Sequence, residues 1–271
     1  MGTTEDTSSS SAFGKTLVVA TKLPGVRIDR AAFLRRSLAP YCTDEQISRA
    51  IADTPAVAGI SVAVLSKIAD ASITNETSKV TALSAAAGIP GGFALFATLP
   101  VDSAQYLAHM LRIAQKLAYL YSWPDLFAKD GDEPDDGTQN VLTLFVGVMF
   151  GVQAANKGIS MIAEKLASQM IKQLPKQALT HGVIYPIVKT VAKHLGVQMS
   201  KGMFAKGVAK VVPVVGGVLS GGLTLATFLP MAKRLRRHLA TLETAKPTGQ
   251  PAAGATTPDT AAPESSEPVQ P

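Results

Sequence analysis

Cysteine is nearly absent from this chain of 271 residues, since Cys42 is the only one. A single cysteine excludes an internal disulfide and any metal site built from several cysteines. Charged residues are also scarce, at 17% of the chain against roughly 25% in ordinary soluble domains. Aromatic residues make up only 6%. So few rings leave little for base stacking, and we expect no specific nucleic-acid partner.

The chain also has few strand patterns and no visible targeting segment. Strict alternation of apolar and polar residues is rare, and no hairpin turn is flanked by it. The first residues are acidic, and the apolar run at 17–20 is far too short for the core of a secretory signal. We therefore expect an intracellular protein without a signal peptide.

Acidic residues almost disappear from the last third of the chain. Residues 157–242 carry thirteen Lys and Arg side chains, and Glu164 is the single acid among them. This positive stretch contains residues 211–232, a glycine-rich segment with no charge at all. An apolar segment with cations on both sides indicates contact with an anionic membrane surface.

Helical signals dominate the remainder, so the sequence predicts an all-α multi-helix bundle with glycine-rich helices or hairpins in its centre. Thr43 and Gln46 fit a capping box that starts a helix toward Ala52. Apolar residues recur at helical spacing in 103–121, 159–170 and 184–195. Gly196 is placed to end the third of these helices, and Ser200 to cap a fourth over 201–212. The predicted loops are 23–27, 73–78 and 131–137.

Both ends of the chain have the composition of disordered segments. We predict a disordered arm at 1–13, a single helical domain at 14–242, and a disordered tail rich in Pro, Ala and Thr at 243–271.

Three charge-free segments, 82–101, 137–156 and 211–232, each contain glycines four residues apart. Such glycines allow another backbone to approach closely, either in a soluble core or against a membrane partner. In the second segment, Ala155 extends the face of Gly147 and Gly151 by one turn. As a helix, residues 211–232 would be about 33 Å long, although Pro213 and Pro230 interrupt its ends. A bilayer span, a shallow or hairpin insertion and a buried core element all remain open for it.

No set of residues specifies a reaction. Tyr185 and Lys189 have the Y-x-x-x-K spacing of short-chain dehydrogenases, but no glycine-rich dinucleotide motif accompanies them. None of the four histidines pairs with Cys, Asp or Glu at ligand spacing, so we predict no metal and no cofactor. A nucleophile, a base and an orienting group cannot be assembled from spacing. We expect a non-enzymatic protein, and an enzyme that uses Tyr185, Lys189 or His109 ranks last among the hypotheses.

Two blocks of sequence resemble a known family. Gly88-Ile-Pro-Gly-Gly92, Leu99-Pro100-Val-Asp102 and the stretch from Leu111 to Tyr121 resemble the central block of the bacterial EcsC family. Residues 206–222 resemble its second block, and also the hydrophobic domain of the YcjF-like group that accompanies some bacterial GTPases. In the family, glycine often follows the tyrosine at position 121, where this chain has Ser122. The resemblance implies an all-helical, hydrophobic protein that acts at a membrane, and it supplies no catalytic residue.

Two functions follow as hypotheses. The first is a non-enzymatic protein, peripheral or shallowly inserted at the cytoplasmic face of a membrane. Its lysine-bearing helices would bind anionic lipid, and its G-x-x-x-G faces would contact a membrane partner such as a transporter. The alternative is a soluble helical domain that binds a lipid or another apolar small ligand. The residues predicted to contact membrane or partner are Lys189, Lys193, Lys201, Lys206, Lys210, Gly216, Gly217, Gly221, Gly222, Lys233, Arg234, Arg236 and Arg237.

Overall fold

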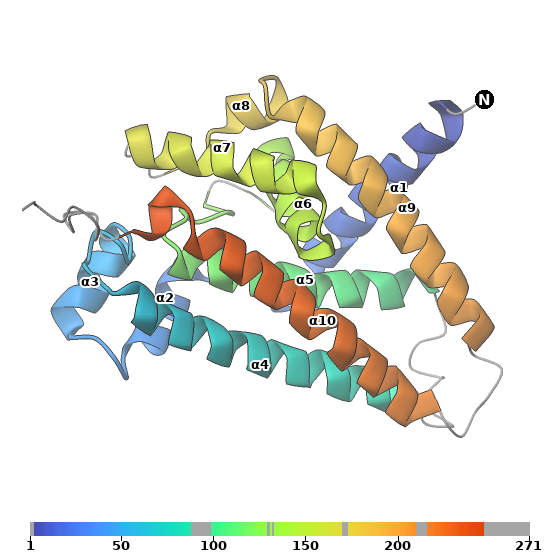
Figure 1. Ribbon diagram of the computed structural model, residues 1–271, viewed down its shortest axis with the longest axis horizontal. Helices are drawn as coiled ribbons and strands as arrows, with labels where there is room; N and C mark the ends of the chain where they lie inside the picture. The colour runs from blue at the N-terminus through green and yellow to red at the C-terminus, as the bar shows by residue number, and fades with distance from the viewer. Residues whose placement is uncertain are drawn as a thin grey trace, which may run out of the picture.

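The computed structural model describes residues 3–87, 99–128, 131, 133–169, 173–209 and 216–246. Within these ranges, side chains are described except at 3–11, 83–87, 99–103, 169, 199–209 and 216–224. The described residues form ten α-helices and no strand, which confirms the predicted all-α class (Figure 1). The helices are α1 Thr3–Lys22, α2 Arg30–Leu38, α3 Asp44–Ala52, α4 Val62–Ala87, α5 Leu99–Leu120, α6 Asp136–Phe150, α7 Gln153–Gln169, α8 Lys176–Thr180, α9 Tyr185–Ala209 and α10 Gly216–Ala240. A short 3-10 turn, η2 Glu243–Ala245, follows α10.

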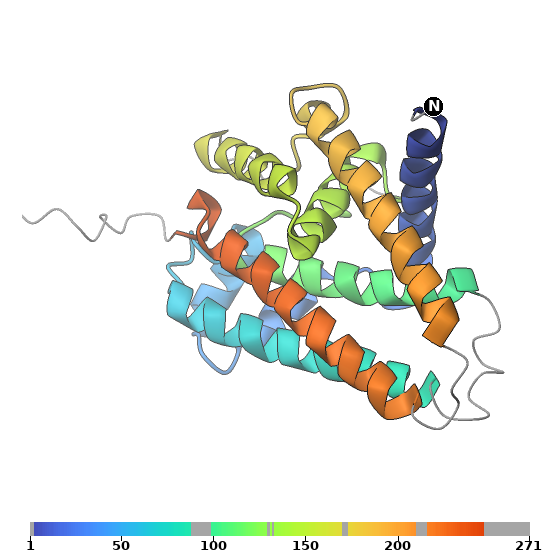
Figure 2. The ribbon, with the colours of Figure 1, turned by 45° about the vertical axis from the view of Figure 1, so that its right-hand side comes forward.

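Helix α5 is the centre of the bundle. It contacts α1, α2, α4, α6, α9 and α10, and its residues from Ile113 to Leu120 are all buried. Helices α4 and α10 pack along each other on one side of α5, while α1 and α9 cross on another (Figure 2). Beyond the end of α5, the indole of Trp123 meets the ring of Phe145 edge-on, with 4.9 Å between centroids.

Several helix ends follow directly from local sequence. Thr43 and Gln46 form the predicted capping box at the start of α3. Asp135 caps α6, and Gly151 ends it in the left-handed conformation, at φ 79°. Ser122 takes a similar conformation, at φ 68°, directly after α5. Its hydroxyl accepts a hydrogen bond from the backbone N–H of Ala56 at 3.0 Å, which offsets the cost of placing a side chain there.

Four predictions about local structure are wrong. Residues 73–78 are not a loop but the middle of α4. Helix α9 runs through Gly196 and Ser200, so the predicted stop and the new cap do not exist. Helix α10 continues past Pro230 to Ala240. Gly196 and Pro230 disfavour a helix by about 1 and 3 kcal/mol, and burial of nearby apolar side chains such as Leu195 and Phe228 outweighs these costs.

The fourth correction concerns Ala155. It does not extend the small face of α6, because α6 ends at Phe150 and Ala155 lies on α7. It faces Gly147 from there: a β-carbon built on Gly147 would lie 2.8 Å from that of Ala155 and 2.4 Å from Cγ1 of Val191. The absence of a side chain at Gly147 therefore lets α6, α7 and α9 meet.

The predicted domain boundaries can be compared with the helices only in part. Helix α1 begins at Thr3, inside the range predicted as a disordered arm, and Phe13 is buried. The turn η2 lies inside the range predicted as a tail, with Thr244 and Ala245 buried. Residues 247–271 and the glycines at 88 and 92 lie outside the described residues. The boundaries as a whole remain predictions.

Candidate functional site

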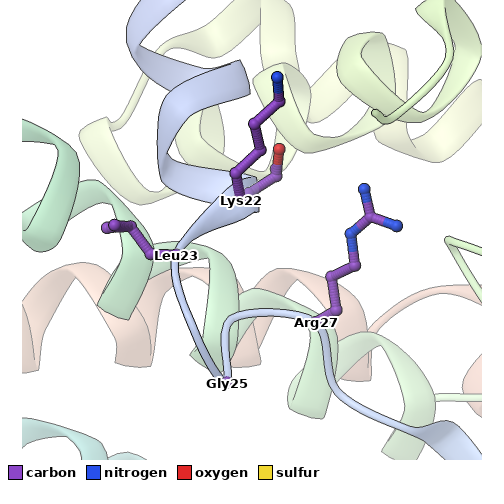
Figure 3. A pocket seen from close by; sticks show the side chains of 5 residues that line it. Lys22, Leu23, Gly25 and Arg27 are labelled. Atoms are coloured by element: carbon purple, nitrogen blue, oxygen red, sulfur yellow. The ribbon is translucent and has the colours of Figure 1, made fainter. Parts of the chain in front are cut away.

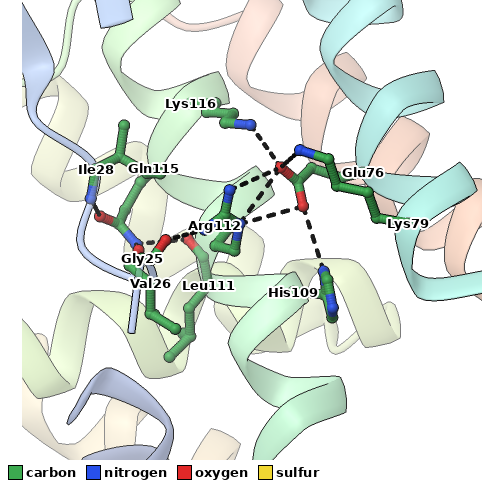
Figure 4. Close-up of polar contacts among 10 residues, drawn as sticks. All are labelled: Gly25, Val26, Ile28, Glu76, Lys79, His109, Leu111, Arg112, Gln115 and Lys116. Atoms are coloured by element: carbon green, nitrogen blue, oxygen red, sulfur yellow. Dashed lines mark hydrogen bonds and ion pairs between the residues drawn. The ribbon is translucent and has the colours of Figure 1, made fainter. Parts of the chain in front are cut away.

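The most highly charged place in the described interior is centred on Glu76, in the middle of α4. Its side chain has no exposed surface. Three side chains of α5, those of His109, Arg112 and Lys116, converge on its carboxylate (Figure 4). Their spacing of three and four residues places them on one face of that helix. We call these four residues the Glu76 cluster.

The distances in the Glu76 cluster are those of ion pairs and charge-assisted hydrogen bonds. Lys116 Nζ lies 2.5 Å from Glu76 Oε1, and Arg112 Nε lies 3.3 Å from Oε2. His109 Nδ1 lies 3.3 Å from Oε2. Lys79, one turn further along α4, reaches Oε1 at 3.8 Å from a half-exposed position. Both carboxylate oxygens are therefore occupied by cationic or N–H donors.

These contacts decide the charge state of the buried acid. Burial by itself raises the pKa of Glu76. The hydrogen bonds from His109 and Lys116 and the charges of Lys116 and Arg112 lower it by more, so the pKa lies well below its ordinary range. Burial lowers the pKa of Lys116, and the contact with Glu76 partly offsets that effect. Glu76 is thus ionised at neutral pH, enclosed and fully engaged. It is a structural group and not a base available to an external substrate.

The same face of α5 also holds the loop between α1 and α2. Arg112 donates from Nη1 to the carbonyl of Gly25, which has φ 70°. Gln115 accepts from the N–H of Ile28 and donates to the carbonyl of Val26, both at 2.9 Å. Arg112 therefore joins the loop to α4 through α5, and the cluster links three separate segments.

A first cleft, of about 440 Å³, lies beside this loop and is lined by Thr21, Lys22, Leu23, Gly25 and Arg27 (Figure 3). Both of its cations have partners. Lys22 forms an ion pair with Glu133. Arg27 donates to the carbonyl of Gly131 at 2.6 Å and lies 4.9 Å from the centre of the Phe127 ring. Engaged in this way, the two side chains anchor the loop.

A second cleft, of about 410 Å³, lies between α1, α6 and α9. We call it the α1–α9 groove. Its lining is mixed, since the apolar residues Phe13, Leu17 and Val188 are almost completely buried. The other residues that line it are Gly14, Gln139, Asn140, Thr143, Tyr185, Lys189, Ala192 and Lys193. The Lys189 ammonium lies 4.7 Å from the centre of the Tyr185 ring, a cation–π distance. The Y-x-x-x-K pair is thus brought together at a groove.

The predicted contact residues fall into three groups. Lys189, Lys193, Lys233 and Arg237 have exposed side chains on α9 and α10. Arg234 and Arg236 already have intramolecular partners, since Arg234 donates to the carbonyl of Met149 and Arg236 to Asp70, each at 2.6 Å. The third group is placed by its helix backbone alone: Lys201 and Lys206 on α9, and Gly216, Gly217, Gly221 and Gly222 on α10. Lys210 lies outside the described residues.

Sequence reasoning missed the Glu76 cluster. One usable signal existed, because Arg112 and Lys116 are four residues apart in a helix whose only other Asp, Glu, Lys or Arg is Asp102. Their partner was hidden because residues 73–78 were predicted to be a loop. Among the described residues, no group of three or more His, Cys, Asp or Glu is placed to hold a metal ion.

Of the helices that can be assessed in the described ranges, none combines the length and the apolar character needed to cross a bilayer. No family model, curated protein or solved structure matches this chain. The fold and the Glu76 cluster define the class of this protein: it is an all-helical bundle with a buried carboxylate that cations contact. Its two last α-helices, α9 and α10, are basic. The resemblance to the EcsC family stays an expectation based on the residues that carry it.

Proposed function

We propose that this protein is a non-enzymatic helical protein that attaches to anionic lipid surfaces through α9 and α10. One observation carries the proposal: these two helices contain eight Lys and Arg residues and no Asp or Glu. Each cation near an anionic membrane contributes about 1 kcal/mol to binding. A handful of them is enough for reversible attachment.

The arrangement of the helices supports a contact at one end of the molecule. The C-terminal ends of α4 and α9 and the N-terminal ends of α5 and α10 lie together at the right of Figures 1 and 2. The charge-free segments 82–101 and 211–232 include three of these helix ends, and Lys201 and Lys206 belong to the last turns of α9. Apolar glycine-rich sequence and two of the eight cations thus belong to the same end of the fold, as expected for a lipid-facing surface.

Cosedimentation with vesicles tests this function. We expect binding to phosphatidylcholine vesicles that contain phosphatidylglycerol, and loss of binding as salt is raised. The double substitution Lys201→Gln/Lys206→Gln removes about 2 kcal/mol and should lower partitioning by about 30-fold. Lys157→Gln/Lys165→Gln on α7 is the matched control. Equal binding to pure phosphatidylcholine vesicles in high salt would overturn the proposal.

A second candidate function, the binding of an apolar small ligand by a helical domain, is favoured by the α1–α9 groove. Its volume lies within the range of about 300–1,000 Å³ usual for ligand sites. Organic extraction of the purified protein followed by mass spectrometry would identify a copurified ligand. An extract without any small molecule would count against this candidate.

A further inference from the structure

The C-terminal half of α10 presents three cations on one face. Lys233 and Arg237 are one helical turn apart, Arg234 lies on the same side, and all three residues are exposed. Leu235 and Leu239 are fully buried on the opposite side of the helix. Packing of these leucines fixes the rotation of α10 and turns the three cations away from the core. We call Lys233, Arg234 and Arg237 the α10 basic face.

The charge of the α10 basic face is not compensated within the described ranges. No carboxylate pairs with it there, since Asp70 accepts from the neighbouring Arg236 and Glu243 pairs with Lys246, each at 2.6 Å. Arg234 donates to a backbone carbonyl at 2.6 Å, which satisfies one donor but leaves its positive charge. Three adjacent cations without an acid complement an anionic partner.

The chain itself supplies an anionic segment directly after this part of the fold. Residues 247–271 contain Asp259, Glu264 and Glu267, and they contain no Lys or Arg. We call these three residues the tail acids. Their segment follows η2, the short turn that comes after α10. The most basic part of α10 and the only acids of the tail are therefore close along the chain.

The tail acids are within reach of the α10 basic face. The segment starts from a fixed point, because Leu242 and Ala245 are buried just before Lys246. A flexible chain spans about 20 Å over the interval from Lys246 to Asp259, and about 25 Å as far as Glu267. The α10 basic face lies only about 5–10 Å back along the helix from its last residue. A tether of this length gives an effective concentration in the millimolar range.

We propose that residues 247–271 dock on the α10 basic face through the tail acids. The contact is a set of exposed ion pairs between Asp or Glu carboxylates and Lys or Arg side chains. The C-terminal end of α10 lies at the left of Figure 1, and the C-terminal end of α9 lies at the right. The docked segment therefore leaves the end of α9 uncovered. The inference goes beyond the proposed function and does not depend on binding to lipid.

Zero-length coupling of the full chain with a water-soluble carbodiimide tests this contact, because the reagent joins a carboxylate only to an amine that touches it. Peptide mass spectrometry identifies the coupled pairs. We expect the tail acids to couple to Lys233 at least about fivefold more than to Lys189, which is exposed on α9. Raised salt should lower the yield at Lys233, because it screens exposed ion pairs.

Arg237→Gln separates docking from simple proximity along the chain. It should lower coupling at Lys233 about two- to fivefold, as expected when one exposed ion pair is lost. Lys206→Gln is the matched control. It removes one positive charge from the last turns of α9 and should leave coupling at Lys233 unchanged.

Three outcomes would overturn the proposal. The first is coupling of the tail acids to Lys189 as readily as to Lys233, and the second is coupling at Lys233 that Arg237→Gln does not change. The third is coupling between two chains in a mixture of isotopically labelled and unlabelled protein, which would show that the tail of a second copy occupies the face. Because no vesicle is present, failure here is distinguishable from failure of the proposed function.

Discussion

At the scale of single residues, Glu76 is tolerated in the interior because cationic side chains in direct contact with it compensate its charge. An isolated buried carboxylate would take up a proton or destabilise the fold by several kcal/mol. Here Lys116, itself only 7% exposed, donates to it at 2.5 Å, and Arg112 and His109 reach its second oxygen. The cations depend on the acid in return, because Lys116 would otherwise be a buried charge without a partner.

Glu76→Gln is expected to lower the free energy of unfolding by about 3–5 kcal/mol, the usual cost of breaking a buried ion pair by removing one partner. Urea unfolding followed by circular dichroism measures the change. Glu164→Gln, on the exposed side of α7, is the matched control and should change stability by less than about 0.5 kcal/mol. If the two substitutions have equal effects, the cluster does not stabilise the fold.

At the scale of elements, the meeting of α6, α7 and α9 depends on Gly147. Gly147→Ala should lower the free energy of unfolding by about 1–3 kcal/mol, because the new β-carbon would overlap the side chain of Val191. Gly14→Ala, the same change in an open part of α1, should raise it by about 0.5–1 kcal/mol. Thermal or urea unfolding of both variants gives the comparison. A stabilised Gly147→Ala variant would mean that the helices are not in close contact there.

Helix α10 contains Pro230 in its interior, where proline removes one backbone hydrogen bond. Pro230→Ala should raise the free energy of unfolding by about 1–3 kcal/mol, since the lost bond returns and only part of the gain is offset by a more flexible unfolded chain. Pro186→Ala is the control. Pro186 lies in the first turn of α9, where its missing N–H would have no helical partner, so little change is expected. Chemical denaturation measures the free energy of unfolding of both variants. Equal changes would show that the missing backbone hydrogen bond at Pro230 does not destabilise α10.

At the scale of the whole molecule, the pKa of Glu76 makes stability depend on pH. The folded-state pKa lies below that of a free glutamate, about 4.3, so the unfolded chain binds more protons at acidic pH. The contribution of Glu76 is therefore fully present above about pH 5 and is lost progressively as the pH falls below about 4. Asp135, whose pKa is lowered by its contact with Lys176 despite partial burial, acts in the same direction.

We expect a melting temperature that changes little between pH 7 and about pH 5 and then falls steeply. Glu76→Gln should flatten the acid decline, because the group that titrates is gone. Melting curves by circular dichroism across this range test the linkage. If the wild-type and Glu76→Gln curves fall in parallel, another group is responsible for the loss of stability.

The helices that sequence predicted correctly are those with local signals. The capping box at Thr43 starts α3, and apolar spacing locates α5 and α7. Errors occurred where a local signal was opposed by packing. Residues 73–78 contain several polar side chains typical of a loop, yet Ile73 and Glu76 are fully buried. Gly196 likewise resembles a helix end, but α9 continues through it to Ala209.

The candidate sites were predictable to different degrees. Lys189 and Lys193 were selected from charge alone, and the structure places them at a groove that the sequence did not indicate. The contact between Glu76 and Lys116 joins residues 40 positions apart. No spacing rule connects such residues, because their proximity depends on how α4 packs against α5.

The sequence by itself determined the helical class, several helix boundaries and the concentration of cations in the last third, because these depend on periodicity, caps and composition. Only the tertiary structure decided which charges are buried and satisfied, that Arg234 and Arg236 have intramolecular partners, and that a groove lies between α1, α6 and α9 beside Lys189. The reason is physical. Burial and electrostatic pairing are properties of surfaces brought together by packing, and packing is decided by the whole set of helices at once.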